Sequence, residues 1–175
     1  ESDKATFQLE TVAEGLEHPW GLAFLPDGSQ LVTERNGQLR HIENGQLDDS
    51  PIQGLPELAV SGQGGLLDII LHPEFEQNRT LFLSYAHKVS REGLTTRVAR
   101  ATLRDDRLED VTVIFEAMPR GTTSRHFAGR MAFDAEGNLY VAVGDRGEMD
   151  RAQKTDDDAG GVHRITVDGE PAAGN

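Results

Sequence analysis

The feature that most constrains the fold of this chain is an internal repeat. Three units each begin with a glycine that opens a short apolar strand, at Gly21, Gly65 and Gly129, and continue through a turn, a second strand, a loop and a third strand. The units lie near residues 12–50, 60–115 and 120–170. Strand-only repeats of about 40–50 residues are typical of β-propeller blades. The sequence therefore predicts an all-β propeller of about three blades, each a four-stranded antiparallel sheet.

The turns and strands of the repeat support this prediction. Pro26–Gly28 and Glu136–Asn138 combine a fixed φ, side-chain acceptors and residues that tolerate a positive φ. The flanking strands are rich in Val, Ile, Leu, Phe and Tyr, and no segment keeps a helical period. An irregular β-sandwich or barrel with similar hairpins is the alternative, but the three units agree in order as well as in composition. Natural propellers have about 4–8 blades. A chain with three blades is therefore predicted to be a fragment, a truncated chain or a half that pairs with another copy.

Composition narrows the possible partners. The formal net charge is −13 at pH 7, whereas nucleic acids and anionic membranes attract basic surfaces. No apolar run approaches the ~20 residues that span a bilayer, so we expect neither nucleic acid binding nor membrane insertion. The start, Glu1–Lys4, is no signal peptide, and fits a mature chain from which one has been removed. Without cysteines the chain has no disulfide or thiolate chemistry.

The loops that precede the three first strands occupy equivalent positions in the repeat. Aligning the units places His18, Gly62 and His126 in register. In a propeller the first strands run along the central channel, so these loops meet at one end of it. We therefore expect their side chains to line a shared cavity, where propellers commonly bind ligands.

The third hairpin predicts a more specific contact. Its turn centres on Glu136, so antiparallel pairing places Gly129 near Val143 and, further along, His126 opposite Asp145. A histidine paired with a carboxylate at a cavity mouth is typical of a general base whose tautomer the carboxylate sets. The alternative is an ion pair at the end of two strands with no chemical role, and spacing alone leaves both possibilities open.

Three other patterns carry less information. Asn78–Thr80 matches a glycosylation acceptor, which matters only in a eukaryotic secretory pathway. The acidic run Asp156–Asp158 lacks the alternating ligands and the glycine of a calcium loop. Gly62–Gly65 is rich in glycine but does not form the Gly-x-Gly-x-x-Gly pattern that opens a helix in nicotinamide-binding proteins. We therefore assign no metal ligand within the chain.

Four stretches carry a specific resemblance. They are GLEHPWGLAFLPDGSQLVTERNGQLRHI, GQGGLLDIILHPEFEQNRTLFLSYA, LEDVTVIFEAMP and NLYVAVGDRGEMDRAQ. In their content and order the chain resembles the soluble aldose and glucose/sorbosone dehydrogenases, a family of quinoproteins, over most of residues 12–170. The resemblance implies that residues 1–175 are the N-terminal half of a six-bladed propeller. It also implies oxidation of aldose sugars at C1 to lactones with pyrroloquinoline quinone and calcium, with electrons passed to a dye or respiratory acceptor.

The resemblance also assigns roles to individual residues. His126 matches the catalytic base, Asp145 the carboxylate that orients it, and Gln63 a polar contact to the quinone. The base would remove the proton of the sugar C1 hydroxyl while hydride passes to the quinone. Two departures from the family pattern are Arg125, just before the histidine, and Asp158–Gly161. The ligands of calcium and of the quinone carboxylates are expected in later blades, so this chain alone should bind cofactor poorly or not at all.

The family is usually exported, which implies a periplasmic location in a bacterium. Two other functions remain open. One is a non-catalytic propeller module that assembles with a second copy or a partner and binds a sugar-like ligand. The other is a calcium-dependent hydrolase of the lactonase type. That class uses carboxylate and asparagine ligands, whereas the three loops that meet at the end of the channel here carry His, Gln and Trp.

Overall fold

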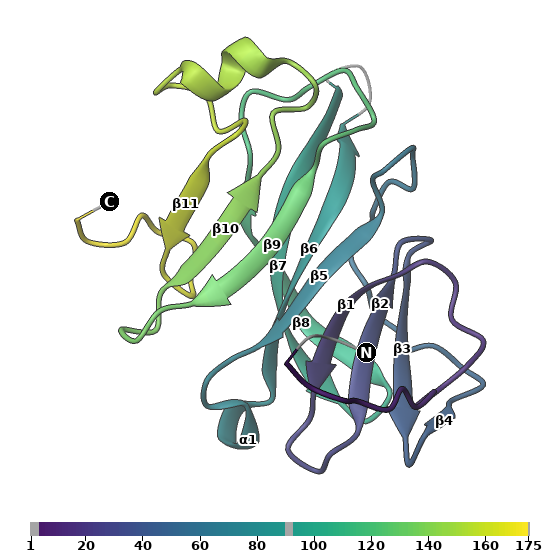
Figure 1. The fold of residues 1–175 in the computed structure, drawn as a ribbon. Coiled ribbons are helices and arrows are strands. Elements are labelled where there is room, and N and C mark those ends of the chain that lie inside the picture. The colour runs from purple at the N-terminus through teal and green to yellow at the C-terminus, as the bar shows by residue number, and fades with distance from the viewer. Residues whose placement is uncertain (1–3, 90–92, 175) are drawn as a thin grey trace.

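The computed structural model describes residues 4–89 and 93–174, which form three antiparallel sheets arranged side by side (Figure 1). The strands of the first sheet are β1 (Pro19–Phe24), β2 (Gln30–Glu34), β3 (Gln38–Glu43) and β4 (Gln46–Leu47). Those of the second are β5 (Leu66–Leu71), β6 (Thr80–Val89), β7 (Gly93–Arg104) and β8 (Arg107–Glu116). Those of the third are β9 (Ala128–Phe133), β10 (Leu139–Val143) and β11 (Val162–Ile165). The helices are a single turn, α1 (Phe75–Asn78), and a 3₁₀ segment, η1 (Met149–Gln153).

The first strands of the three sheets are neighbours, as a propeller requires: β5 contacts both β1 and β9. The third sheet differs from the expectation of four strands, because its order is β11-β10-β9 and no fourth strand joins it within the described residues. After β11 the chain turns tightly between Thr166 and Glu170, and only an isolated bridge from Ile165 to Pro171 follows. Proline has no N–H to continue a ladder.

The hydrophobic core lies between the sheets. Leu81 and Leu83 of β6 pack toward the first sheet, with Leu31 of β2, while Phe82 packs toward the third, with Leu139 of β10. This alternation follows from the two-residue period of a strand. The second sheet is therefore apolar on both faces and joins its two neighbours.

Each first strand carries an irregularity at its beginning. The pairing register shifts between Pro19 and Gly21 in β1, between Leu66 and Ile69 in β5, and between Ala128 and Met131 in β9. Bulges of this kind bend a strand, redirect its side chains and leave backbone groups outside the ladder. All three lie at the end of the sheet where the preceding loops enter.

Hydroxyl groups on the second strands bind the backbone groups that these bulges free. Thr33 of β2 accepts the Gly21 N–H at 2.8 Å and donates to the Leu67 carbonyl of the next sheet. Ser84 of β6 repeats the pattern, accepting the Asp68 N–H at 2.9 Å and donating to the Gly129 carbonyl at 2.7 Å. These two hydroxyl bridges join the first sheet to the second and the second to the third.

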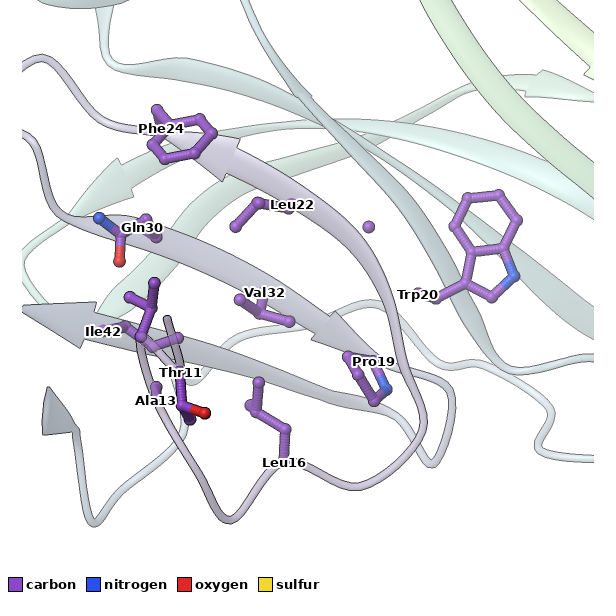
Figure 2. Close-up of a pocket in the computed structure, with 12 residues that line it drawn as sticks. Thr11, Ala13, Leu16, Pro19, Trp20, Leu22, Phe24, Gln30, Val32 and Ile42 are labelled. Carbon is purple, nitrogen blue, oxygen red and sulfur yellow. The ribbon is translucent and has the colours of Figure 1, made fainter. Parts of the chain in front are cut away.

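One face of the first sheet has no neighbouring sheet among the described residues. Leu22 and Phe24 project from it with 53% and 67% exposure, and the segment before β1 covers it only partly. Between that segment and the sheet lies an apolar cavity of about 470 Å³, lined by side chains that include Leu16, Val32 and Ile42 (Figure 2). We call this surface the open face of the first sheet.

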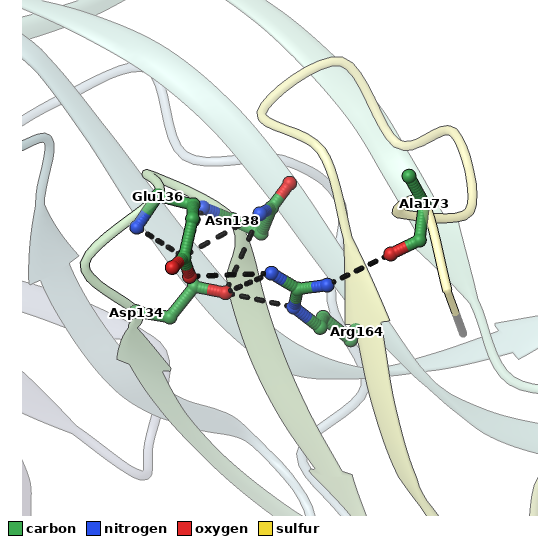
Figure 3. Close-up of polar contacts among 5 residues, drawn as sticks. All are labelled: Asp134, Glu136, Asn138, Arg164 and Ala173. Carbon is green, nitrogen blue, oxygen red and sulfur yellow. Dashed lines mark hydrogen bonds and ion pairs between the residues drawn. The ribbon is translucent and has the colours of Figure 1, made fainter.

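The β9–β10 turn, predicted from its Glu-Gly-Asn sequence, is organised by Asp134. One carboxylate oxygen accepts the backbone N–H groups of Glu136 at 3.0 Å and Asn138 at 2.8 Å, and the other accepts Nε of Arg164 at 2.7 Å (Figure 3). Arg164 also donates to the Ala173 carbonyl at 3.0 Å. The turn is thereby attached to β11 and to the segment that follows it. Neither helical segment among the described residues has the length and hydrophobicity of a membrane span.

Candidate active site

The three loops predicted to meet do lie together, and they share a backbone conformation. His18, Gly62 and His126 all have left-handed φ values, of 51°, 58° and 53°. Two of the three are not glycine, and a non-glycine residue rarely adopts this conformation. The register derived from the repeat is therefore visible in the backbone itself.

Successive contacts connect the loops. The His18 carbonyl accepts the Arg35 N–H at 3.1 Å, and the Arg35 guanidinium donates to the Gly62 carbonyl. The adjacent Gln63 accepts the backbone N–H of His126 through Oε1 at 2.8 Å. A Cβ on Gly62 would collide with Ser124 beside this contact, so glycine is required for the two loops to approach.

His126 and Asp145 form the predicted pair, with 2.6 Å between Nδ1 and Oδ1. The same carboxylate oxygen accepts the Gly147 N–H at 2.8 Å, and these hydrogen bonds, Gly147 first and His126 second, lower the pKa of Asp145 below its usual value. An ionised Asp145 assigns the imidazole proton to Nδ1 and leaves Nε2 with a lone pair. Because the His126 side chain is 49% exposed, solvent or a ligand can reach the ring.

A bulge lies next to the pair. The expected pairing was Gly129 with Val143, but the structure pairs Ala128 with Val143 because Gly129, with a φ of 97°, lies in the bulge. Beyond that pair the Gly144 N–H donates to the Phe127 carbonyl at 3.1 Å, and the Arg146 N–H lies 3.4 Å from the His126 carbonyl. These backbone contacts hold the segment of Asp145 beside that of His126.

The chain contains a second histidine–aspartate pair of similar geometry. His41 Nδ1 lies 2.7 Å from Asp48 Oδ2 on the first sheet. His41 belongs to β3, away from the three loops. Pairing alone therefore does not define a site. The position of His126 at the meeting point of the loops distinguishes it.

A buried carboxylate that was not singled out in the sequence links the three first strands. Asp68 of β5 accepts the Met131 N–H at 2.8 Å and Arg130 Nη1 at 2.9 Å, and the Arg130 guanidinium stacks on the ring of Trp20 in β1, 4.6 Å from its centroid. Burial raises the pKa of Asp68, and these hydrogen bonds offset only part of that effect. With its side chain only 4% exposed, Asp68 joins strands and has no access to a substrate.

Several hydrogen-bond donors lie around His126. The amide Nε2 of Gln63 has no partner among the described residues, Arg125 directly precedes His126, and Arg35 donates to the Gly62 carbonyl. Arg130 is already paired with Asp68. Pyrroloquinoline quinone carries carboxylates that such groups attract. Ligands for calcium are not grouped in the same way: in the part of the chain described, no three His, Asp or Glu side chains lie together to hold a metal ion.

The shared cavity expected where the three loops meet stays a prediction. The His126 side chain is half exposed, and the 470 Å³ apolar cavity lies elsewhere, on the open face of the first sheet, lined by neither His126 nor Asp145. Asn78, the potential glycosylation site, bonds through its side chain to the Thr80 N–H at 2.9 Å and to His72. Asp157, in the acidic run, binds the Arg151 guanidinium through both oxygens at 2.8 and 2.9 Å.

Neighbouring antiparallel sheets with their first strands in contact, and a histidine–aspartate pair where their loops meet, define a propeller-type protein with a candidate acid–base site. The chain belongs to the Glucose / Sorbosone dehydrogenase family, whose model matches residues 16–175. It is 40% identical over 169 residues to aldose sugar dehydrogenase YliI of Escherichia coli (strain K12), covering 95% of this chain and 46% of that protein.

Solved structures agree with this assignment. The apo-form of the soluble aldose sugar dehydrogenase of Escherichia coli matches with a TM-score of 0.90 and 39% identity, over 95% of this chain and 49% of the other. The PQQ-bound form of aldose sugar dehydrogenase from Streptomyces coelicolor matches with a TM-score of 0.84 and 31% identity, over 95% and 50%. The propeller prediction is thus confirmed. The chain spans about half the length of the curated relatives it matches.

Proposed function

We propose that this chain supplies the general base, and the carboxylate that orients it, to a quinoprotein dehydrogenase that oxidises aldose sugars at C1 to lactones. The observation that carries the proposal is the His126–Asp145 pair, with Nδ1 bound at 2.6 Å and the ring accessible. Membership of the family and the names of its relatives, which include a PQQ-bound aldose sugar dehydrogenase, support the choice of substrate and cofactor.

In this proposal Nε2 of His126 takes the proton of the sugar C1 hydroxyl. Asp145 remains ionised and stabilises the positive charge that the ring then carries. Gln63 fixes the His126 backbone through Oε1 and offers its amide N–H groups to the cofactor. Pyrroloquinoline quinone, when bound, supplies the acceptor for the hydride.

The remaining parts of the proposal concern what lies beyond these residues. The ligands for calcium and further contacts to the quinone would come from blades outside this chain, so this chain supplies only part of the active site. Pyrroloquinoline quinone and calcium are the proposed cofactors, an aldose is the proposed substrate, and the periplasm of a bacterium is the proposed location.

The experiment compares His126→Ala with His41→Ala in a chain extended to the full length of the aldose sugar dehydrogenases. A positioned base contributes about 10²–10⁴-fold to proton transfer, so His126→Ala should lower dye-linked turnover by that range while quinone binding, measured by fluorescence titration, persists. His41→Ala removes a pair of the same geometry and should leave turnover within about twofold.

Unchanged turnover per folded molecule in His126→Ala, with normal quinone binding, would remove His126 from the reaction. The 175-residue chain is tested alongside with calcium and quinone added. It should show little or no aldose oxidation, and rapid turnover by this chain alone would contradict the proposal that it holds only part of the site.

A further inference from the structure

Arg146 is a buried arginine with an unusual set of partners. It is 3% exposed, and in the described part of the chain no carboxylate forms an ion pair with it. Its guanidinium instead donates to three backbone carbonyls: Nε to Arg125 at 3.0 Å, Nη1 to Leu94 at 3.2 Å, and Nη2 to Thr123. Burial, with a smaller effect from the charge of Arg151, lowers the pKa of Arg146 to about 10, so it stays charged at neutral pH. A buried charge of this kind is costly unless its hydrogen bonds are satisfied.

The partners of Arg146 belong mainly to one segment, residues 123–127, which we call the His126 loop. The guanidinium lies 3.7 Å from the centroid of the Phe127 ring, next to His126. The backbone of Arg146 also contacts the loop: the Arg146 N–H lies 3.4 Å from the His126 carbonyl, and the Thr123 hydroxyl donates to the Arg146 carbonyl. Arg146 therefore contacts the loop before, at and after the histidine.

The His126 loop needs such support. His126 and Ala128 both have left-handed φ values, 53° and 55°, and a non-glycine residue keeps this strained conformation only where its surroundings hold it. The side chain of Asp145 holds the imidazole ring. The adjacent Arg146 holds the backbone beneath it. Asp145 and Arg146, consecutive residues shortly after β10, thus hold the imidazole ring and the loop backbone respectively.

We infer that Arg146 is the positioning residue of the proposed base, holding the His126 loop so that the imidazole stays within hydrogen-bonding distance of Asp145. The inference rests on the function proposed above. Arginine suits the task because its planar fork offers donors in several directions and a flat surface that stacks on Phe127. Lysine keeps the charge but has neither the fork nor the plane.

The test uses Arg146→Met, with Arg151→Met as the matched control. Arg151 is also buried and also donates to a backbone carbonyl, that of Pro119 at 2.6 Å, but its carboxylate partner is Asp157 and it does not contact the His126 loop. Both variants should lower the melting temperature. The discriminating readout is the ¹⁵N–¹H signal of the His126 ring in the full-length enzyme, assigned by its loss in His126→Ala and recorded below each variant's melting transition.

Arg146→Met should lose the hydrogen-bonded Nδ1–H signal, or shift it to the position found in Asp145→Asn, while Arg151→Met keeps it. Arg146→Lys should recover thermal stability more fully than the His126 signal. In the full-length enzyme, a displacement of about 1 Å predicts a fall in kcat of about 10²-fold with little change in KM.

An unchanged His126 signal in folded Arg146→Met overturns the inference. If neither Arg146 variant folds at low temperature while Arg151→Met does, Arg146 maintains the fold as a whole and the inference is also wrong. The ring signal is independent of turnover. A wild-type enzyme with the signal but without dehydrogenase activity would therefore refute the proposed function and leave the positioning role standing.

Discussion

At the scale of single residues, the site depends on a histidine held in a backbone conformation that such residues rarely adopt. His126 and His18 share it, and glycine adopts it at the third equivalent position, Gly62. The left-handed conformation turns each loop toward its neighbour, where Gln63 reaches His126. A residue of ordinary φ at position 126 would direct the ring elsewhere.

Asp145→Asn should reduce turnover less than His126→Ala, because Asp145 orients and polarises the base without taking the substrate proton. The pKa of Asp145 is lowered by the Gly147 N–H and by His126, so the group that the substitution removes is an ionised carboxylate. Steady-state kcat of the wild type and of both variants checks this. An Asp145→Asn enzyme with unchanged kcat would mean that Asp145 does not act on the base.

Much of the site could be predicted from the sequence, because a hairpin turn fixes pairing within about one residue. That was enough to bring His126 and Asp145 together. It was not enough to identify the bulge at Gly129, which shifts the pairing by one residue. Arg146 itself was missed because, in the sequence, an arginine directly after Asp145 looks like one half of a solvent-exposed ion pair. Only the packing reveals that it points into the protein.

At the scale of elements, the bulged first strands and the hydroxyls that bind them determine how neighbouring sheets meet. Sequence periodicity predicted the strands but not the bulges, because a bulge adds one residue without changing composition. In the first two sheets, Thr33 and Ser84 lie on the second strand opposite the bulge. In the third sheet the corresponding residue, on β10, is Ala142, which has no hydroxyl. Within the described residues, hydroxyl bridges therefore join the first sheet to the second and the second to the third, and the third sheet has no equivalent hydroxyl.

Thr33→Val should destabilise the chain although it changes the side-chain shape very little. The substitution leaves the Gly21 N–H and the Leu67 carbonyl buried without their partner, and each unsatisfied buried group costs about 1–3 kcal/mol. Chemical denaturation with urea measures the loss. Thr112→Val on β8 removes an exposed hydroxyl and should change the free energy of unfolding by less than about 0.5 kcal/mol. Equal effects of the two substitutions would show that the bridge contributes no stability.

At the scale of the whole molecule, the prominent feature is the open face of the first sheet. Both faces of the second sheet are covered by neighbours, whereas Leu22 and Phe24 project from the first sheet with more than half of their surface exposed. Exposed apolar patches of this kind mark surfaces that associate. The repeat agrees with an uncovered face, because three blades are fewer than the roughly 4–8 that propellers typically have.

The 175-residue chain should therefore self-associate or aggregate, and substitution of the open face should reduce this. Leu22→Lys with Phe24→Lys places two charges on the face, whereas Val113→Lys on β8 alters an exposed apolar residue elsewhere. Light scattering with size-exclusion chromatography should show large species for the wild type and for Val113→Lys, and mainly monomer for the double variant. A monodisperse wild-type monomer with a cooperative melting transition would contradict this expectation.

The hydroxyl bridges have a consequence for how such a molecule can arise. Thr33 and Ser84 make the same two bonds, one inside their own sheet and one to the next. The first and second sheets thus each carry a bulged first strand and, on the second strand, the hydroxyl that binds the next sheet. Copying one such unit within a gene copies the junction with it. Ancestral duplication could therefore lengthen the array one sheet at a time without inventing a new interface, leaving the loops above each bulge free to diverge.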